Sequence, residues 1–203
     1  MIVNKKRQMF LSDTEIRGML YSKGKQFLLQ RLAKPQPRSN PSFYGGHSIE
    51  IRKAEYAVHS LNLGRGSYGY KTVCPYGTVG DVLWEKECWK IASAAEEEIS
   101  YRADNSVVRY LNSPNAFWIG KSEDTKWRSP VTMPQWASRI TMLITDLKLK
   151  PVQDVTPAEA KIMGFELEQS LEEYSSWWDH THAKSGFVFS TNPWVWSIEV
   201  EVI

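Results

Sequence analysis

The sequence has little cysteine and no long apolar run. Cys74 and Cys88 are its only cysteines, too few for a disulfide scaffold, and the absence of a CxxC pair disfavours a zinc site. No apolar stretch approaches the roughly 18–20 residues of a membrane span, and none behind the N-terminal Lys and Arg residues suits a signal peptide. We therefore expect a cytoplasmic protein with reduced thiols and no membrane partner.

Motifs of the common catalytic and metal sites are also missing. The chain has no phosphate-binding glycine loop and no nucleophile elbow. His180 and His182 could be two metal ligands, but no third ligand is near in the sequence, so we expect them at a surface helix end. These absences favour a protein with no metal and no cofactor.

What the chain has in abundance is tryptophan, nine residues among 203, and an uneven distribution of charge. Residues 1–40 hold nine Lys or Arg against two acidic residues, whereas residues 151–203 hold two Lys against nine acidic residues. A basic face attracts polyanions such as nucleic acid. The alternative is that the two ends neutralise each other in the fold. Similarly, most tryptophans should be core, while one or two could stack on bases.

Local patterns predict mostly strands, with helices between them. Ser12 with Glu15, and Thr156 with Glu159, form capping boxes that predict helix starts, and Gly164 should end the second helix. A further helix should carry Leu167, Leu171, Tyr174 and Trp178 on one face. Short or alternating apolar segments predict strands of one sheet system at residues 26–32, 82–89, 138–147 and 195–202.

The remaining segments are weakly patterned. Residues 35–70 are rich in Pro, Ser, Gly and Asn and predict a long loop region, with a short hairpin at 48–57 as one alternative. We expect one α+β domain over residues 1–203, a small mixed β-barrel with peripheral helices and insertions near 36–70 and 105–132.

Six short pieces in order resemble a phage and prophage group within the ASCH domain superfamily, which has a PUA-like β-barrel. The pieces are residues 10–35, CPYG with GDVLWEKECW (74–77, 80–89), YRAD (101–104), MPQWASRIT (133–141), DVTPAEA (154–160) and NPWVW (192–196). Each piece is weak alone. The resemblance implies the barrel fold, a phage origin, the host cell cytoplasm and a cleft that binds RNA or modified nucleotides.

Some members of this superfamily are amidohydrolases that act on acetylated cytidine, with a catalytic Lys, Thr and Glu. The resemblance places Gln26, Leu29 and Met163 at those three positions. Gln cannot take up and release a proton at ordinary pH, and the Leu and Met side chains have no acidic group and no nucleophile. We therefore expect no catalytic residues of the family type, and no deacetylation of acetylcytidine.

Polar, basic and aromatic residues remain beside the expected cleft. The candidate nucleic-acid or ligand-binding residues are Lys25, Gln26, Arg31, Glu87, Trp89, Trp136, Ser138, Arg139 and Trp194. A guanidinium beside an indole suits an unstacked base and its phosphate. The alternative is that Arg139 pairs with Glu87 as part of the structure.

Three functional hypotheses follow from these residues. The first is a non-catalytic protein that binds single-stranded RNA or a modified nucleotide in a basic, Trp-lined cleft. The second is a phage protein that binds and inhibits a host protein, and the third is a hydrolase or nuclease acting on RNA or modified nucleosides. Salt distinguishes the first two, because an apolar protein interface releases no counterions.

Overall fold

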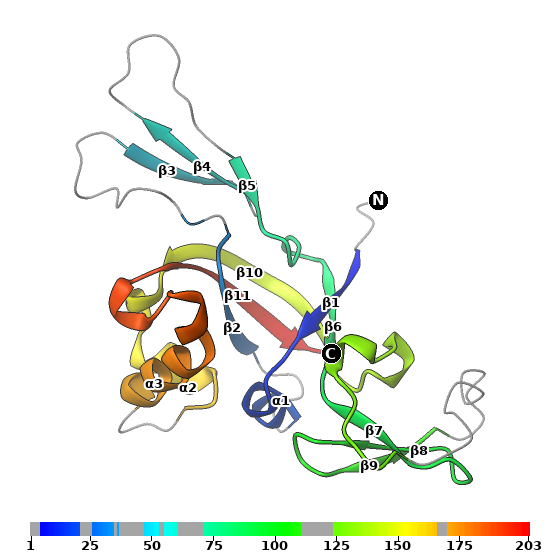
Figure 1. The fold of residues 1–203 in the computed structure, drawn as a ribbon. Coiled ribbons are helices and arrows are strands. Elements are labelled where there is room, and N and C mark those ends of the chain that lie inside the picture. Colours follow the sequence, from blue (N-terminus) through cyan, green and yellow to red (C-terminus); the bar gives the residue numbers. More distant parts are fainter. Residues whose placement is uncertain are drawn as a thin grey trace. The chain divides into compact units, whose positions relative to one another are not determined.

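The computed structural model describes residues 5–20, 26–34, 36, 47–52, 55–60, 71–110, 124–165 and 170–203 (Figure 1). It is a mixed α+β structure in which sheets dominate. The strands are β1 Lys6–Phe10, β2 Gln26–Leu32, β3 His47–Arg52, β4 Glu55–Ser60, β5 Lys71–Val73, β6 Val82–Lys86, β7 Trp89–Ser93, β8 Glu98–Tyr101, β9 Val107–Arg109, β10 Thr141–Pro151 and β11 Trp194–Val202. The α-helices are α1 Asp13–Leu20, α2 Pro157–Ile162 and α3 Ser170–His182.

Short 3-10 helices join several of these elements: η2 Pro130–Thr132, η3 Gln135–Ala137, η4 Val152–Asp154, η5 Ala183–Ser185 and η6 Phe189–Thr191. The strands form three sheets with the orders β1-β6-β10-β11-β2, β3-β4-β5 and β7-β8-β9. The first sheet contains strands from all four segments that the sequence predicts to share a sheet: β2, β6, β10 and β11. The bounds differ most in two of them, because β6 ends at Lys86 and β10 begins at Thr141, not at residue 138. None of the helices that the structure describes has the length and apolar character needed to cross a membrane.

The chain divides into two compact units, each built from segments that are distant in the sequence. The first unit contains residues 1–25, 82–142 and 202–203, and the second contains residues 26–81 and 143–201. The prediction of one domain with two insertions stays a prediction.

The first unit has its core around β7 and β8. Trp89, Ile91, Ile99, Tyr101 and Met133 are buried there, with Trp136 and Tyr110 partly buried against them. Strand β1 pairs with β6 in parallel, from Lys6 opposite Val82 to Phe10 opposite Lys86. Helix α1 begins as predicted, because the Ser12 backbone N–H donates to Glu15 Oε2 (2.8 Å) and the Glu15 N–H donates to Ser12 Oγ (3.3 Å).

The second unit has its core between the β2–β11 pair and helices α2 and α3. Leu28, Leu32 and Val195 pack against Tyr174 and Trp178 of α3. Strand β11 pairs antiparallel with β2, Val195 opposite Leu32 and Glu201 opposite Gln26. The inward set that the alternation predicts is confirmed: Trp196, Ile198, Val200 and Val202 are all buried.

Three segments differ from the sequence prediction. Residues 82–89 are not one strand, because the chain leaves β6 at Glu87, whose N–H donates to Met133 Sδ (3.2 Å), before β7 starts another sheet. Residues 35–70 contain the predicted hairpin as β3 and β4, and β5 extends it to a three-stranded sheet. Leu171 does not share the buried face of α3 and is 38% exposed; Leu167 lies outside the described residues.

Candidate functional site

The predicted binding residues fall into two groups, one in each unit. Lys25 lies outside the described residues. The first unit holds Glu87, Trp89, Trp136, Ser138 and Arg139, and the second holds Gln26, Arg31 and Trp194. The prediction that the two groups line one cleft stays a prediction.

Arg139 is the centre of the first group, and its guanidinium is held by acidic side chains. Arg139 Nε lies 2.6 Å from Glu87 Oε1 and Nη2 lies 2.9 Å from Glu87 Oε2, a two-point pairing. Its Nη1 donates to Asp104 (2.9 Å) and to Ser106 (2.7 Å), and the guanidinium lies 4.3 Å from the centre of the Tyr101 ring. The alternative in which Arg139 pairs with Glu87 as part of the structure is confirmed.

Burial and this pairing set the ionisation of the carboxyl groups. The Glu87 side chain is fully buried, and burial raises its pKa while the hydrogen bonds from Arg139 lower it. For Asp104, burial opposes ionisation, but hydrogen bonds from Arg139 and Ser106 lower the pKa to about 2. The pKa of Arg139 is raised: burial lowers it, but the bonds to Glu87 and Asp104 outweigh burial.

Glu85 is the residue of this group that sequence reasoning missed. It is fully buried and accepts hydrogen bonds from the Ser138 hydroxyl and from the N–H groups of Arg139 (2.8 Å) and Ile140 (3.1 Å). Burial raises the pKa of Glu85 to about 8, although the two backbone N–H groups oppose the shift. The sequence could have indicated this burial, because side chains alternate along a strand and Glu85 lies midway between Leu83 and Glu87. All three side chains are buried.

The two predicted tryptophans of the first unit have different environments. Trp89 is 3% exposed, and its Nε1 donates to Thr132 Oγ1 (3.3 Å) while the Arg128 guanidinium lies over its ring (4.9 Å). Trp89 is therefore a core residue, the alternative expected for most tryptophans. Trp136 is half-buried and packs edge-on against Tyr110, with ring centres 5.5 Å apart.

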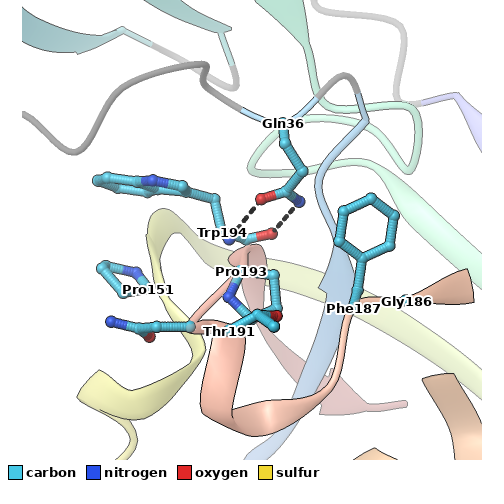
Figure 2. A pocket seen from close by; sticks show the side chains of 8 residues that line it. Gln36, Pro151, Gly186, Phe187, Thr191, Pro193 and Trp194 are labelled. Atoms are coloured by element: carbon cyan, nitrogen blue, oxygen red, sulfur yellow. Dashed lines mark hydrogen bonds between the residues drawn. The ribbon is translucent and has the colours of Figure 1, made fainter. Parts of the chain in front are cut away.

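The second unit contains a cavity, and Trp194 is one of the residues that line it. The cavity has a volume of about 350 Å³ and is lined by Gln36, Pro151, Gly186, Phe187, Thr191, Asn192, Pro193 and Trp194. Figure 2 shows the Trp194 and Phe187 rings there together with Pro151 and Pro193. All of these residues belong to the second unit. We call this cavity the Trp194 pocket.

Gln36 fixes the Trp194 backbone where strand pairing ends. Ala33 N–H donates to the Trp194 carbonyl (3.0 Å), next to the paired residues Leu32 and Val195. Beyond it, Gln36 Nε2 donates to the same carbonyl (2.9 Å) and the Trp194 N–H donates to Gln36 Oε1 (2.7 Å), as the dashed lines of Figure 2 show. The side-chain amide thus replaces a strand residue, and sequence reasoning missed this role.

Helix α3 positions the opposite part of the lining. Trp178 Nε1 donates to the Phe187 carbonyl (2.8 Å), and Asp179 Oδ1 accepts from the Phe189 N–H (2.5 Å). The chain then turns at Asn192, which has a left-handed backbone (φ +48°), and the Pro193 carbonyl accepts from the Val152 N–H (2.8 Å). These bonds fix the backbone of the lining at Phe187, Phe189 and Pro193.

Positive charge lies in the same unit as the pocket, at the end of β2. Burial lowers the pKa of His182, and the nearby charges of Arg31 and Lys34 lower it further. Arg31 also acts on Tyr76, where burial raises the phenol pKa and Arg31 opposes that rise. Arg31 and Lys34 are therefore close to the C-terminal end of α3, which η5 connects to Gly186 and Phe187 of the pocket.

The three positions at which the resemblance places catalytic residues differ in their exposure to solvent. Gln26 is exposed at the start of β2, Leu29 is fully buried in the same strand, and Met163 is the buried C-terminal cap of α2. His182 ends α3, as predicted for a helix end, and His180 lies in its last turn.

No group of three or more His, Cys, Asp or Glu side chains that could hold a metal ion occurs within the part of the chain that the structure describes. The Trp194 pocket offers aromatic and proline faces together with amide and hydroxyl groups, and Arg31 and Lys34 belong to the same unit. Comparisons of the chain with family models, with curated proteins and with solved structures found no match in any of the three.

Proposed function

We propose that the protein binds single-stranded RNA or a modified nucleotide without catalysis, with one base in the Trp194 pocket. The observation that carries this proposal is a cavity with an aromatic lining, in a unit that also holds Arg31 and Lys34 near the C-terminal end of α3. The ASCH resemblance, with its PUA-like barrel and phage origin, is part of the same proposal.

The size and lining of the pocket suit a base with its sugar. Ligand sites are typically concave, of roughly 300–1,000 Å³, mostly apolar, and carry a few fixed polar groups. The Trp194 pocket, at about 350 Å³, combines the rings of Trp194 and Phe187 with the amide of Asn192. A base can stack on such a ring whatever its identity, because every base has a π face.

The basic residues supply the second requirement, attraction of the phosphate. Arg31 and Lys34 act together on His182, so their positive charges reinforce each other at one place. Lys34 is exposed and Arg31 is half-buried. A phosphate next to a base in the pocket would meet both charges, which favours a nucleotide over an uncharged nucleoside.

Trp136 and Arg139 stay the predicted second contact with the nucleic acid. The pairing of Arg139 with Glu87 and Asp104 neutralises its charge. We therefore expect Arg139 to orient the bound nucleic acid without attracting its phosphates, and Trp136 to contact it through its half-buried ring. The Trp194 pocket, not Arg139, is the stronger candidate for the main contact.

Fluorescence anisotropy with a labelled ten-nucleotide RNA tests the proposal. Trp194→Ala should weaken binding by about 1–3 kcal/mol, the usual value of one base stacked on an aromatic ring. The matched control is Trp127→Ala, which removes another half-buried tryptophan outside the pocket and should leave affinity unchanged. Melting curves of both variants check that each variant retains the fold.

Absence of RNA and DNA binding by the wild-type protein at low salt would overturn the proposal, because phosphate contacts are strongest there. A host protein retained at high salt would then favour the alternative of an inhibitor of a host factor. Equal losses for the two tryptophan variants would show that the Trp194 pocket is not the binding site.

A further inference from the structure

A second cavity of about 350 Å³ lies in the same unit, and the proposed function does not use it. Its lining consists of Gln153, Val155, Leu171, Glu172, Ser175 and Phe189. We call it the Leu171 cavity. Its apolar groups are the Phe189 ring, Val155 and Leu171, which is 38% exposed. Its only charged group is the exposed carboxylate of Glu172.

Gln153 connects the two cavities. It lines the Leu171 cavity, and its backbone N–H donates to the side-chain oxygen of Asn192, which lines the Trp194 pocket (3.0 Å). The Gln153 side-chain amide donates to the Phe189 carbonyl (2.9 Å). Helix η6, Phe189–Thr191, begins at a residue of one cavity and ends at a residue of the other. The two cavities are therefore neighbours.

Asn192 presents a hydrogen-bond donor at this junction. Its side-chain oxygen accepts from Gln153, which fixes the orientation of the amide. Its amide nitrogen makes no hydrogen bond to any residue in the described ranges. A fixed amide with a free N–H group suits the sugar or phosphate that links two nucleotides.

We propose that the Leu171 cavity is a second subsite, so that the ligand is an oligonucleotide of at least two nucleotides. This inference rests on the proposed function, because the first base occupies the Trp194 pocket. The occupant of the Leu171 cavity is a base and not a phosphate, since the carboxylate of Glu172 repels a phosphate. A carboxylate accepts hydrogen bonds from an exocyclic amino group, so the base is one that has such a group, cytosine for example.

Titration calorimetry with UMP, UpU, UpC and CpU tests the second subsite. The better of UpC and CpU should bind the wild-type protein at least about tenfold tighter than UMP, because a second stacked base contributes about 1–3 kcal/mol. It should also bind a few fold tighter than UpU. Leu171→Ala should reduce the dinucleotide gain to less than about twofold and leave the affinity for UMP unchanged.

Two further variants make the test specific. Glu172→Gln should reduce the preference for the cytosine-containing dinucleotide over UpU, because it keeps the shape of the side chain and replaces the carboxylate by a neutral amide oxygen, a weaker acceptor. Ile162→Ala is the control for Leu171→Ala: Ile162 is 44% exposed on α2 and lines neither cavity, so its loss should change nothing.

The outcomes separate this inference from the proposed function. Equal wild-type affinity for UMP and for all dinucleotides overturns the second subsite while nucleotide binding stands. A dinucleotide gain that survives Leu171→Ala, or a preference for cytosine that Glu172→Gln leaves unchanged, also overturns it, because the second base then binds elsewhere. No binding of UMP, dinucleotides or longer RNA overturns both.

Discussion

At the residue scale, the ionisation of Glu85 gives the clearest solution test of the first unit. Burial raises its pKa to about 8, from an ordinary value of 4.5. Between these values the folded chain holds a proton that the unfolded chain has released, so the free energy of unfolding falls as pH rises. The stabilisation is complete below about pH 4.5 and is lost as pH rises to about 8. The shift corresponds to about 5 kcal/mol.

Urea unfolding between pH 5 and 8.5 measures this slope. We expect Glu85→Gln to remove most of this dependence of the free energy of unfolding on pH. The raised pKa of Glu87 should account for the smaller dependence that remains, which has the same sign. Glu96→Gln, which changes an exposed carboxylate of the same unit, should keep the wild-type slope. An unchanged slope in the Glu85 variant would show that Glu85 is ionised in the folded protein.

The sequence predicted some residues of these sites and not others, for physical reasons. Glu87, Ser138 and Arg139 were candidates because they are polar residues beside the cleft that the resemblance implies. In the structure Arg139 pairs with Glu87, and Ser138 and Arg139 both donate to Glu85. Gln36 and Phe187 were not, because their roles depend on a distant partner. Gln36 bonds to a backbone 158 residues away, and no local pattern encodes such a pairing.

At the element scale, Thr156 tests how much a capping box stabilises a short helix. Its hydroxyl accepts from the Glu159 N–H (3.2 Å), and Glu159 Oε2 accepts from the Thr156 N–H (2.8 Å). Thr156→Ala should lower the free energy of unfolding by about 1 kcal/mol, because the Glu159 N–H loses its partner at the helix start. Thermal unfolding measures the change.

Thr181→Ala is the matched control, because the Thr181 hydroxyl bonds to the Trp177 carbonyl within α3 and caps nothing. We expect a change within about 0.5 kcal/mol for this surface position. Equal losses at both positions would mean that the capping box adds no stability beyond an ordinary threonine hydroxyl.

Elements were predictable where their signal is local. Both capping boxes and the alternation of residues 195–202 depend on neighbours in the sequence, and all three are confirmed. The division of residues 82–89 into β6 and β7 was not predictable, because the apolar pattern continues through Glu87 while the chain changes sheet. Glu87 is buried because it pairs with Arg139. Its position therefore continues the inward phase of the strand, and the pattern gives no sign that β6 has ended.

At the scale of the whole molecule, the uneven charge predicts how RNA binding depends on salt. Strand β2 of the basic N-terminal part pairs with β11 of the acidic C-terminal part, yet Arg31 and Lys34 still act together on His182. For single strands, the logarithm of the binding constant falls by about 0.7 per phosphate contact for each unit in the logarithm of the salt concentration. Arg31→Ala and Lys34→Ala should each reduce that slope by about 0.7.

Anisotropy titrations at roughly 50 to 300 mM salt measure both slopes, because affinity that depends on phosphate contacts falls steeply as salt rises. Lys161→Ala removes an exposed lysine from α2 that lines neither cavity, and its slope should equal that of the wild type. A slope that none of the three variants changes would place the phosphate contacts elsewhere on the chain.

The Trp194 pocket has a consequence for finding its ligand without a label. It is assembled from position 36, position 151 and positions 186–194, so the unfolded chain has no pocket, and a ligand binds the folded chain alone. At one hundred times its dissociation constant, such a ligand stabilises the fold by about 2.7 kcal/mol. For a chain of this length that raises the melting temperature by about 5–10 °C. Heating the protein with a panel of nucleotides and oligonucleotides therefore ranks them by affinity.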